Sequence, residues 1–435
     1  MKKIAIIGGG ACGMFGAICA KRAGADVLLL EHTERIGKKL LATGNGKCNL
    51  TNLVLKPGDY YGNHPSFVVP VLKRFNQYDT LKLFEEMGLV WKETNGLVYP
   101  YSNQASTVLD LLRVELKRLQ VRIQTEIKVK EILPDEKKGF LLKTSEGELE
   151  ADCVILACGS KAAPKTGSDG SGYQLAKKLG HSVIEPLPAL VQLKAEGSYF
   201  KMIAGVRSDC RLRLYIEEKE NRKKILAGEE MGEVQFTDYG ISGIPVFQFS
   251  RFAVKALWEK KKAFVVCDFL PQMEETDLYE YLVAKQKRLV HEGCCEELLL
   301  GLLNKKLNLM LLKECGFSPQ ANAGRLSTSD LKKLSRLIKH WKISLKGYNS
   351  FEQGQICQGG IATEELTENL ESRLHKGLYF AGEIIDIDGR CGGYNLQWAW
   401  SCAYVAAVHA AKGALAEKGK DRKISPDGHA GKKEK

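Results

Sequence analysis

The first 31 residues follow one continuous pattern of strand, glycine-rich turn, helix, strand and acid. Residues 3–7 form an apolar run that favours a β-strand, and residues 8–13 carry the spacing G-x-G-x-x-G. Residues 14–23 predict a helix, and residues 27–30 predict a second buried strand, which Glu31 follows directly. This order of elements is typical of a dinucleotide-binding unit, so it predicts an α/β fold.

Each glycine of this motif has its own physical role. Gly8 allows a tight turn, Gly10 lets a pyrophosphate approach the backbone, and Gly13 lets the helix pack closely on the strand. The start of the helix offers free N–H groups and about half a positive charge to phosphates. Glu31 can accept hydrogen bonds from ribose hydroxyls, and its charge opposes a 2′-phosphate. The motif therefore predicts NAD or FAD and does not separate them.

Two further segments favour FAD. Residues 36–52 are dense in Gly, Asn, Thr and Lys, which suits a loop around a long polar cofactor, although a plain surface loop has the same composition. Near the other end, residues 377–381 predict a strand that continues into the acids of residues 382–386. A Gly-Gly pair at residues 392–393 precedes a helix predicted over residues 396–416, whose positive end would favour the negative edge of a reduced flavin.

These segments resemble a known family. The runs GGGACGMFGAICAKRAG, GKKLLATGNGKCNLTN and AGEIIDIDGRCGGYNLQWAW are similar to the bacterial NAD(P)/FAD-dependent flavoproteins of the BaiN and aminoacetone-oxidase type. Residues 166–173 and 232–250 fit the same family, and the resemblance extends from residue 1 to about residue 411.

The resemblance implies non-covalent FAD in a discontinuous Rossmann-like domain with an inserted β-rich domain and a small helical insert. The boundaries that we predict are 1–188 and 346–418 for the FAD-binding domain, 189–345 for the insert (β-rich over 189–272, helical over 273–330) and 419–435 for a disordered basic tail.

The resemblance also implies which residues surround the cofactor. They are Gly8, Gly10, Ala11, Cys12 and Gly13 at the pyrophosphate, Glu31 at the adenosine ribose, Lys38, Lys39, Thr43, Gly44, Asn45, Gly46 and Cys48 along the cofactor, Val129, Ala157 and Gly159 near the adenine, Gly382, Glu383 and Asp386 at the ribityl phosphate, and Tyr394, Asn395 and Leu396 at the flavin edge.

For the reaction, the family resemblance implies reduction of an activated C=C bond by hydride transfer from flavin N5. The substrate would be a 3-oxo-4,6-diene of the bile-acid or steroid type, and NAD(P)H would visit the flavin transiently, because no second G-x-G-x-x-G follows a strand. Tyr394 is the candidate proton donor, with packing against the flavin as its alternative role. Asn395 is also a natural N-cap. Oxidation of a small amine such as aminoacetone by O2 stays open, as does an RNA-binding or RNA-modifying flavoprotein.

Composition sets limits on the other classes of function. The chain has 44% apolar and 27% charged residues, which is typical of a globular protein, and we expect a cytoplasmic location without a membrane span. Its net charge of +12 is compatible with an anionic cofactor, and without an aromatic-rich basic motif a nucleic-acid partner is a minor expectation. The 13 cysteines form no C-x-x-C pair, so reduced thiols are expected and no metal site is predicted. The sequence does not indicate an oligomeric state.

The middle of the chain predicts a change of element type. Residues 121–129, 140–144 and 151–159 predict three strands joined by polar turns. Residues 189–270 predict mainly short strands, and residues 275–313 predict helices whose leucine stripe belongs to a core.

Overall fold

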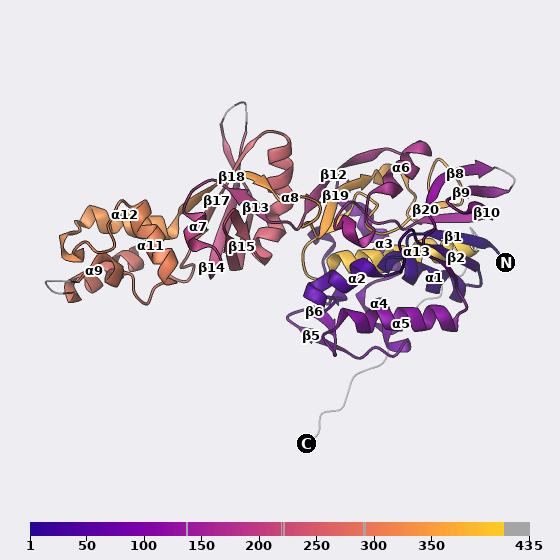
Figure 1. Cartoon of the computed structure of the whole chain (residues 1–435), viewed down its shortest axis with the longest axis horizontal. Helices are drawn as coiled ribbons and strands as arrows, with labels where there is room; N and C mark the ends of the chain where they lie inside the picture. Colours follow the sequence, from indigo (N-terminus) through magenta and orange to yellow (C-terminus); the bar gives the residue numbers. More distant parts are fainter. Residues whose placement is uncertain (136–137, 219, 221, 290–292, 413–435) are drawn as a thin grey trace, which may run out of the picture.

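Two hydrophobic clusters organise the molecule. The computed structural model describes residues 1–135, 138–218, 220, 222–289 and 293–412, so the predicted disordered tail lies outside the described residues. One cluster draws its buried side chains from both ends of the chain, and the other draws them from the middle, between Leu187 and Leu345. Figure 1 shows the two parts side by side along the long axis. The predicted fold class, a discontinuous α/β unit with an insert, is confirmed.

A five-stranded parallel sheet forms the centre of the first part. Its strands, in the order β20-β11-β1-β2-β7, are β20 (Leu378–Phe380), β11 (Cys153–Leu156), β1 (Lys3–Ile7), β2 (Asp26–Leu30) and β7 (Arg122–Gln124). All four neighbouring pairs are parallel. Mainly apolar, buried residues make β20, β11, β1 and β2 fit a sheet that is covered on both faces, whereas β7 is exposed at the edge of the sheet. Because β20 pairs with β11, the sheet joins the two ends of the chain.

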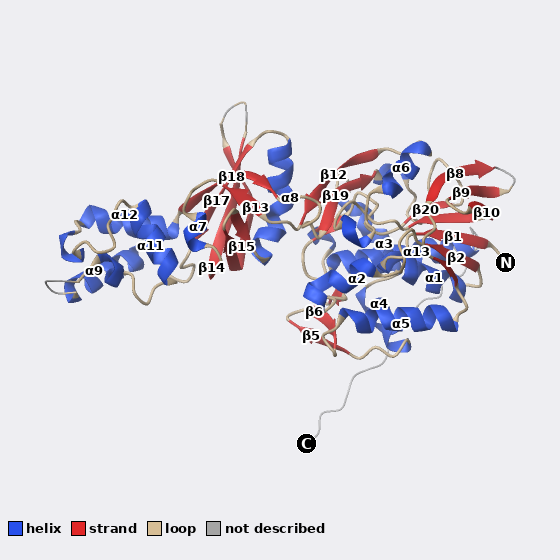
Figure 2. Cartoon of the chain, viewed as in Figure 1, coloured by secondary structure: helices blue, strands red, loops and turns tan. Residues whose placement is uncertain are grey.

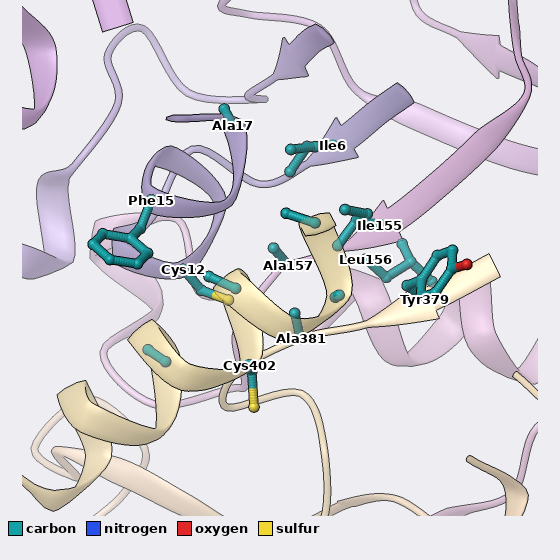
Figure 3. Packing of buried hydrophobic residues seen from close by; sticks show 14 of the residues in the cluster. Ile6, Cys12, Phe15, Ala17, Ile155, Leu156, Ala157, Tyr379, Ala381 and Cys402 are labelled. Atoms are coloured by element: carbon teal, nitrogen blue, oxygen red, sulfur yellow. The ribbon is translucent and has the colours of Figure 1, made fainter. Parts of the chain in front are cut away.

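Two helices pack closely on this sheet. They are α1 (Ala11–Arg22), predicted over 14–23, and α13 (Tyr394–Lys412), predicted over 396–416. Both begin earlier than predicted, and residues 413–416 of the second prediction lie outside the described residues. A Cβ on Gly16 would lie 3.7 Å from the Cβ of Ala403, so small residues let the helices approach each other. Figure 3 shows Cys12 and Phe15 of α1, Cys402 of α13 and the sheet residues Ile6 and Ile155 as members of one buried cluster.

Smaller elements complete this part. Its other helices are α2 (Lys38–Ala42), α3 (Val68–Arg74), α4 (Gln77–Glu86), α5 (Ala105–Arg118) and α6 (Ser171–Lys178). Its other strands are β3 (Thr51–Asn52), β4 (Tyr60–Tyr61), β5 (Trp91–Thr94), β6 (Leu97–Pro100), β8 (Val129–Asp135), β9 (Gly139–Thr144), β10 (Gly147–Ala151), β12 (Val183–Ala189), β19 (Ile356–Ile361) and β21 (Asp388–Gly389). The predicted strand over residues 121–129 is wrong as one element: it ends at Gln124, and Glu126 adopts a positive φ of 61° before β8 begins.

The insert is a closed six-stranded barrel with a helical extension. The barrel strands, in spatial order, are β13 (Leu193–Ala195), β16 (Gly240–Ser242), β15 (Lys224–Thr237), β14 (Arg207–Glu217), β17 (Lys262–Asp268) and β18 (Trp341–Tyr348). Its helices are α7 (Phe200–Ile203), α8 (Ile244–Trp258), α9 (Glu275–Arg288), α10 (Cys295–Leu298), α11 (Lys305–Glu314) and α12 (Thr328–Lys339). Figure 2 shows helices gathered beyond the barrel strands, at the outer end of the insert.

One helix of the insert lies in the region predicted as mainly strands. The prediction missed α8, whose buried Val246, Phe249 and Ala253 recur with a helical period. Pro245 lies in the first turn of this helix, where its fixed φ is favourable. The barrel strand β18 continues to Tyr348, three residues beyond the predicted boundary at 345, and the domain boundaries stay a prediction.

Among the described residues, no helix has the length and apolar character that crossing a membrane would require.

Candidate functional site

A cavity opens where the parallel strands end, with about 1230 Å³ of empty space when the open solvent at its mouth is included. Ile7 at the end of β1, Leu30 at the end of β2 and Ala157 just after β11 all line it. In open parallel sheets, ligands bind outside the carboxyl ends of the strands. Its lining includes the glycine-rich turn at Gly8, Glu31 after β2 and Leu396 at the start of α13, so one extended ligand could contact all three.

The glycine-rich turn forms one wall of this cavity. Gly8 has a φ of +109° and donates its N–H to the Leu30 carbonyl at 2.8 Å. A Cβ on Gly13 would lie far inside van der Waals distance of the Gly8 carbonyl oxygen, so this glycine is required for close packing. A Cβ on Gly10 would meet no described atom within 4 Å. The space in front of Gly10, at the start of α1, therefore fits a pyrophosphate group.

Glu31 is held at the edge of the cavity by backbone donors. Its Oε2 accepts a hydrogen bond from Gly9 N–H at 2.7 Å, and its Oε1 accepts one from Thr33 N–H at 2.8 Å. The residue is only 8% exposed and lines the cavity. Glu31 Oε2 can accept a second hydrogen bond, while Oε1 also has His32 Nδ1 at 3.3 Å, so Glu31 can still bind a ribose hydroxyl through Oε2.

A second carboxylate stands where residues from distant segments meet. Glu383 accepts hydrogen bonds from Lys39 Nζ at 2.7 Å and from Ser160 Oγ at 2.6 Å. Both Lys39 and Glu383 line the cavity. Asn395 and Leu396 line it as well, from the first turn of α13, where free N–H groups carry partial positive charge.

Most of the predicted cofactor residues come together in this cavity. Those that line it are Gly8, Gly10, Ala11, Cys12, Glu31, Lys38, Lys39, Thr43, Val129, Ala157, Gly159, Glu383, Asn395 and Leu396. Those that do not are Gly13, Gly44, Asn45, Gly46, Cys48, Gly382, Asp386 and Tyr394. Gly13 instead permits close backbone packing, and Gly382, with a φ of +80°, lies against the Cys12 side chain. The thiol of Cys48 is buried, which raises its pKa to about 12.

Tyr394 and Asn395 lie at the start of α13 with different partners. The Tyr394 hydroxyl donates to Asp59 Oδ2 at 3.0 Å, and burial together with the Asp59 charge raises the pKa of this tyrosine to about 12. The alternative role of Asn395 as an N-cap is wrong, because α13 begins one residue earlier. Its side chain instead binds the backbone N–H and carbonyl of Gly389, at 2.8 and 2.9 Å.

The sequence reasoning missed several residues that line the cavity. They include His32, Thr33, Arg35, Gly167, Ser168, Gln355 and Ile356. His32 and Thr33 follow Glu31 directly, so their position in the chain was a usable signal. Gln355 and Ile356 carry no local signal, because the pairing of β19 with β12 brings them to the site.

Asp386 lies outside the cavity as a buried carboxylate. It is 2% exposed, and its Oδ2 accepts a hydrogen bond from Asn63 N–H at 2.9 Å. Burial, with Asp388 and Glu364 nearby, raises its pKa from 3.8 to about 6, and Arg251 partly opposes the shift. The folded state therefore binds this proton more tightly than the unfolded state does.

For this reason we expect Asp386 to reduce stability as pH rises. Its protonated form stabilises the fold below about pH 4, and the contribution disappears as pH rises through about 6. Asp386→Asn keeps an acceptor for Asn63 and removes the charge, so the variant should gain up to about 3 kcal/mol over the wild type near neutral pH. Denaturant unfolding of both proteins at about pH 4 and about pH 7.5 measures this. A stability difference that is the same at both pH values contradicts the prediction.

Comparisons with known proteins are consistent with this geometry. The family model described as HI0933-like protein Rossmann domain matches residues 2–409. A 3-dehydro-bile acid delta(4,6)-reductase of Clostridium scindens is 43% identical over 415 residues, covering 95% of this chain and all of the relative. A ribosomal RNA dihydrouridine synthase of Escherichia coli K12 is 30% identical over 411 residues, covering 92% and 96%. Among solved structures, a 3-ketosteroid-delta4-(5alpha)-dehydrogenase of Rhodococcus jostii RHA1 matches with 16% identity and a TM-score of 0.46, covering 94% of this chain and 97% of that chain.

Proposed function

The chain belongs to the HI0933-like Rossmann family, and from this premise we propose that it is an FAD-dependent oxidoreductase that reduces a C=C bond conjugated to a carbonyl group. The observation that carries the proposal is the 43% identity, over 95% of the chain, to a reductase of 3-dehydro-bile acids. The proposed substrate is accordingly a 3-oxo-4,6-diene of the bile-acid or steroid type.

The proposal of FAD rests on the residues of the cavity. The open space at Gly10 suits the pyrophosphate, and Glu31 suits the adenosine ribose. The start of α13, with Asn395 and Leu396, brings partial positive charge to the far end of the cavity, where it would stabilise the anionic edge of a reduced flavin. Bound FAD would supply hydride chemistry at its N5 atom. We propose NAD(P)H as the source of the electrons.

The reaction also needs a proton donor. The hydride adds to the electrophilic carbon of the conjugated system, and a proton then adds to the carbon next to it, so that one C=C bond becomes a C–C bond. We propose Tyr394 for this proton, because it directly precedes Asn395 and Leu396, which line the cavity at the start of α13, and a phenol is protonated at neutral pH. Asp59, which accepts the phenol's hydrogen bond, would orient the side chain.

Anaerobic flavin spectroscopy tests the function. NADH or NADPH should bleach the FAD of the purified protein, and a 3-oxo-4,6-diene steroid acid should restore the oxidised spectrum and consume one equivalent. Tyr394→Phe should slow this reoxidation by about 100-fold, the usual minimum for loss of a general acid, without loss of FAD. Bleaching by aminoacetone without a nicotinamide would replace the reductase proposal with an amine oxidase.

A second candidate acts on RNA. The observation in its favour is the 30% identity, over 92% of the chain, to a ribosomal RNA dihydrouridine synthase. Uridine also contains a C=C bond conjugated to a carbonyl, so the chemistry of the two candidates is the same and only the recognised molecule differs. Reduced protein incubated with unmodified ribosomal RNA should form dihydrouridine under this alternative. If the protein reduces the RNA and does not reduce the dienone, the RNA-modifying function replaces the bile-acid reductase proposal.

A further inference from the structure

A short loop, residues 388–393, connects the insert to the cavity, and we name it the junction loop. It runs from β21 to the start of α13. Gln248 of α8 binds its backbone at two points, because Oε1 accepts from Cys391 N–H at 2.9 Å and Nε2 donates to the Cys391 carbonyl at 3.2 Å. Arg390 donates to both carboxylate oxygens of Glu230, on β15, at 2.7 and 2.9 Å. The insert therefore holds the junction loop from one side, and Figure 1 shows α8 at this junction.

The other side of the junction loop is attached to the cavity. Asn395 binds both backbone groups of Gly389, and Asn52 donates its side-chain amide to the Gly392 carbonyl at 2.9 Å. Asn395 and the next residue, Leu396, line the cavity. The insert and the first turn of α13 thus both bind the junction loop, so a displacement of the insert can reach the α13 start through it.

Three contacts of the insert reach this loop, and Gln248 is the most informative of them. The ion pair between Arg251 and Asp388 is buried, and Asp388 Oδ1 has no described partner, so loss of Arg251 would leave an uncompensated charge and destabilise the fold. The Arg390 and Glu230 side chains are 30% and 23% exposed, which weakens that pair. Gln248 is neutral, and both of its hydrogen bonds go directly to the backbone of the loop.

We propose that Gln248 is a positioning residue through which the insert sets the geometry of the α13 start at the flavin end of the cavity. This inference rests on the proposed binding of FAD. Gln248 is not among the cavity-lining residues, so it acts through Cys391 and the junction loop. The insert would then affect the reaction by holding the α13 start in position, in addition to any contact that it makes with substrate.

The test compares Gln248→Leu with a matched control, Gln286→Leu. Gln286 lies on α9, far from the cavity, is also partly buried, and also makes two hydrogen bonds to backbone, to the Ala323 and Leu326 carbonyls at 2.7 and 2.9 Å. Three quantities are measured: the visible spectrum of bound FAD, kcat and KM with the dienone, and hydrogen exchange of the junction-loop amides in the FAD-free protein.

Gln248→Leu should retain FAD, change its visible spectrum and lower kcat about tenfold or more with a smaller change in KM, because the reacting groups are misplaced. Its junction-loop amides should exchange on the order of tenfold faster. Gln286→Leu should match the wild type in all three quantities. Equal behaviour of the two variants overturns the proposal. If the wild type reduces no dienone but the spectrum and the exchange respond to Gln248→Leu alone, the positioning role stands and only the proposed reaction fails.

Discussion

Gly10→Val is expected to give a folded protein that retains no FAD. A Cβ at this position meets no described atom within 4 Å, so the valine side chain fits the protein itself. It occupies instead the space in front of the α1 start, where the N–H groups of the first turn would hold the pyrophosphate. The far-ultraviolet circular dichroism of the FAD-free protein should therefore match that of FAD-free wild type, while the visible flavin absorbance disappears. Its melting temperature should fall by no more than a few degrees, because valine is a poorer N-cap for α1 than glycine.

The control for this variant is Gly347→Val, on barrel strand β18. A Cβ there lies 3.9 Å from Lys194, an ordinary contact, and valine is favourable in a strand. This control should retain full flavin absorbance. Full FAD occupancy in Gly10→Val would refute the assignment of the glycine-rich turn to the pyrophosphate.

Gly13→Ala, three residues away, should instead destabilise the fold itself. Its added methyl group would overlap the Gly8 carbonyl oxygen, which is backbone and cannot rotate away. Either α1 moves off β1 or the turn rearranges, and both disturb a buried part of the core. We expect a loss of about 3–5 kcal/mol, at the high end for single substitutions. Denaturant unfolding of the FAD-free proteins measures the loss without a contribution from cofactor binding.

Gly16→Ala provides a control on the same helix. Its methyl group would lie 3.7 Å from Ala403, which is normal van der Waals distance, and alanine favours a helix by about 1 kcal/mol over glycine. We expect equal or higher stability in this variant. If Gly13→Ala and Gly16→Ala unfold at the same denaturant concentration, the close approach of Gly13 to the Gly8 carbonyl oxygen does not contribute to stability as predicted.

The sequence could predict those parts of the site that are local in the chain. Gly8, Gly10, Gly13 and Glu31 lie within one βαβ unit, where spacing alone determines which residues turn, pack or face a ligand. The strand β1 also has the predicted bounds, because after Lys3 all of its residues are apolar and buried.

The remaining parts depend on contacts that spacing does not encode. Ile356 reaches the cavity through its pairing with Ala189 at the end of β12, about 170 residues earlier in the chain. The helix α8 is a different case: it lies in a region predicted as mainly strands, and the helical period of Val246, Phe249 and Ala253 was a usable signal that the prediction missed. Gln248 is important only because α8 packs beside the junction loop.

The pairing of β20 with β11 has a consequence for synthesis on the ribosome. Residues 378–380 are translated long after residues 153–156, with the whole barrel and its helices made in between. Until then the outer edge of β11 lacks its native neighbour and exposes unpaired backbone groups, the kind of edge at which chains aggregate. The barrel, whose strands all lie between residues 193 and 348, can close earlier, so the nascent chain acquires its inserted module before its first-made one is complete.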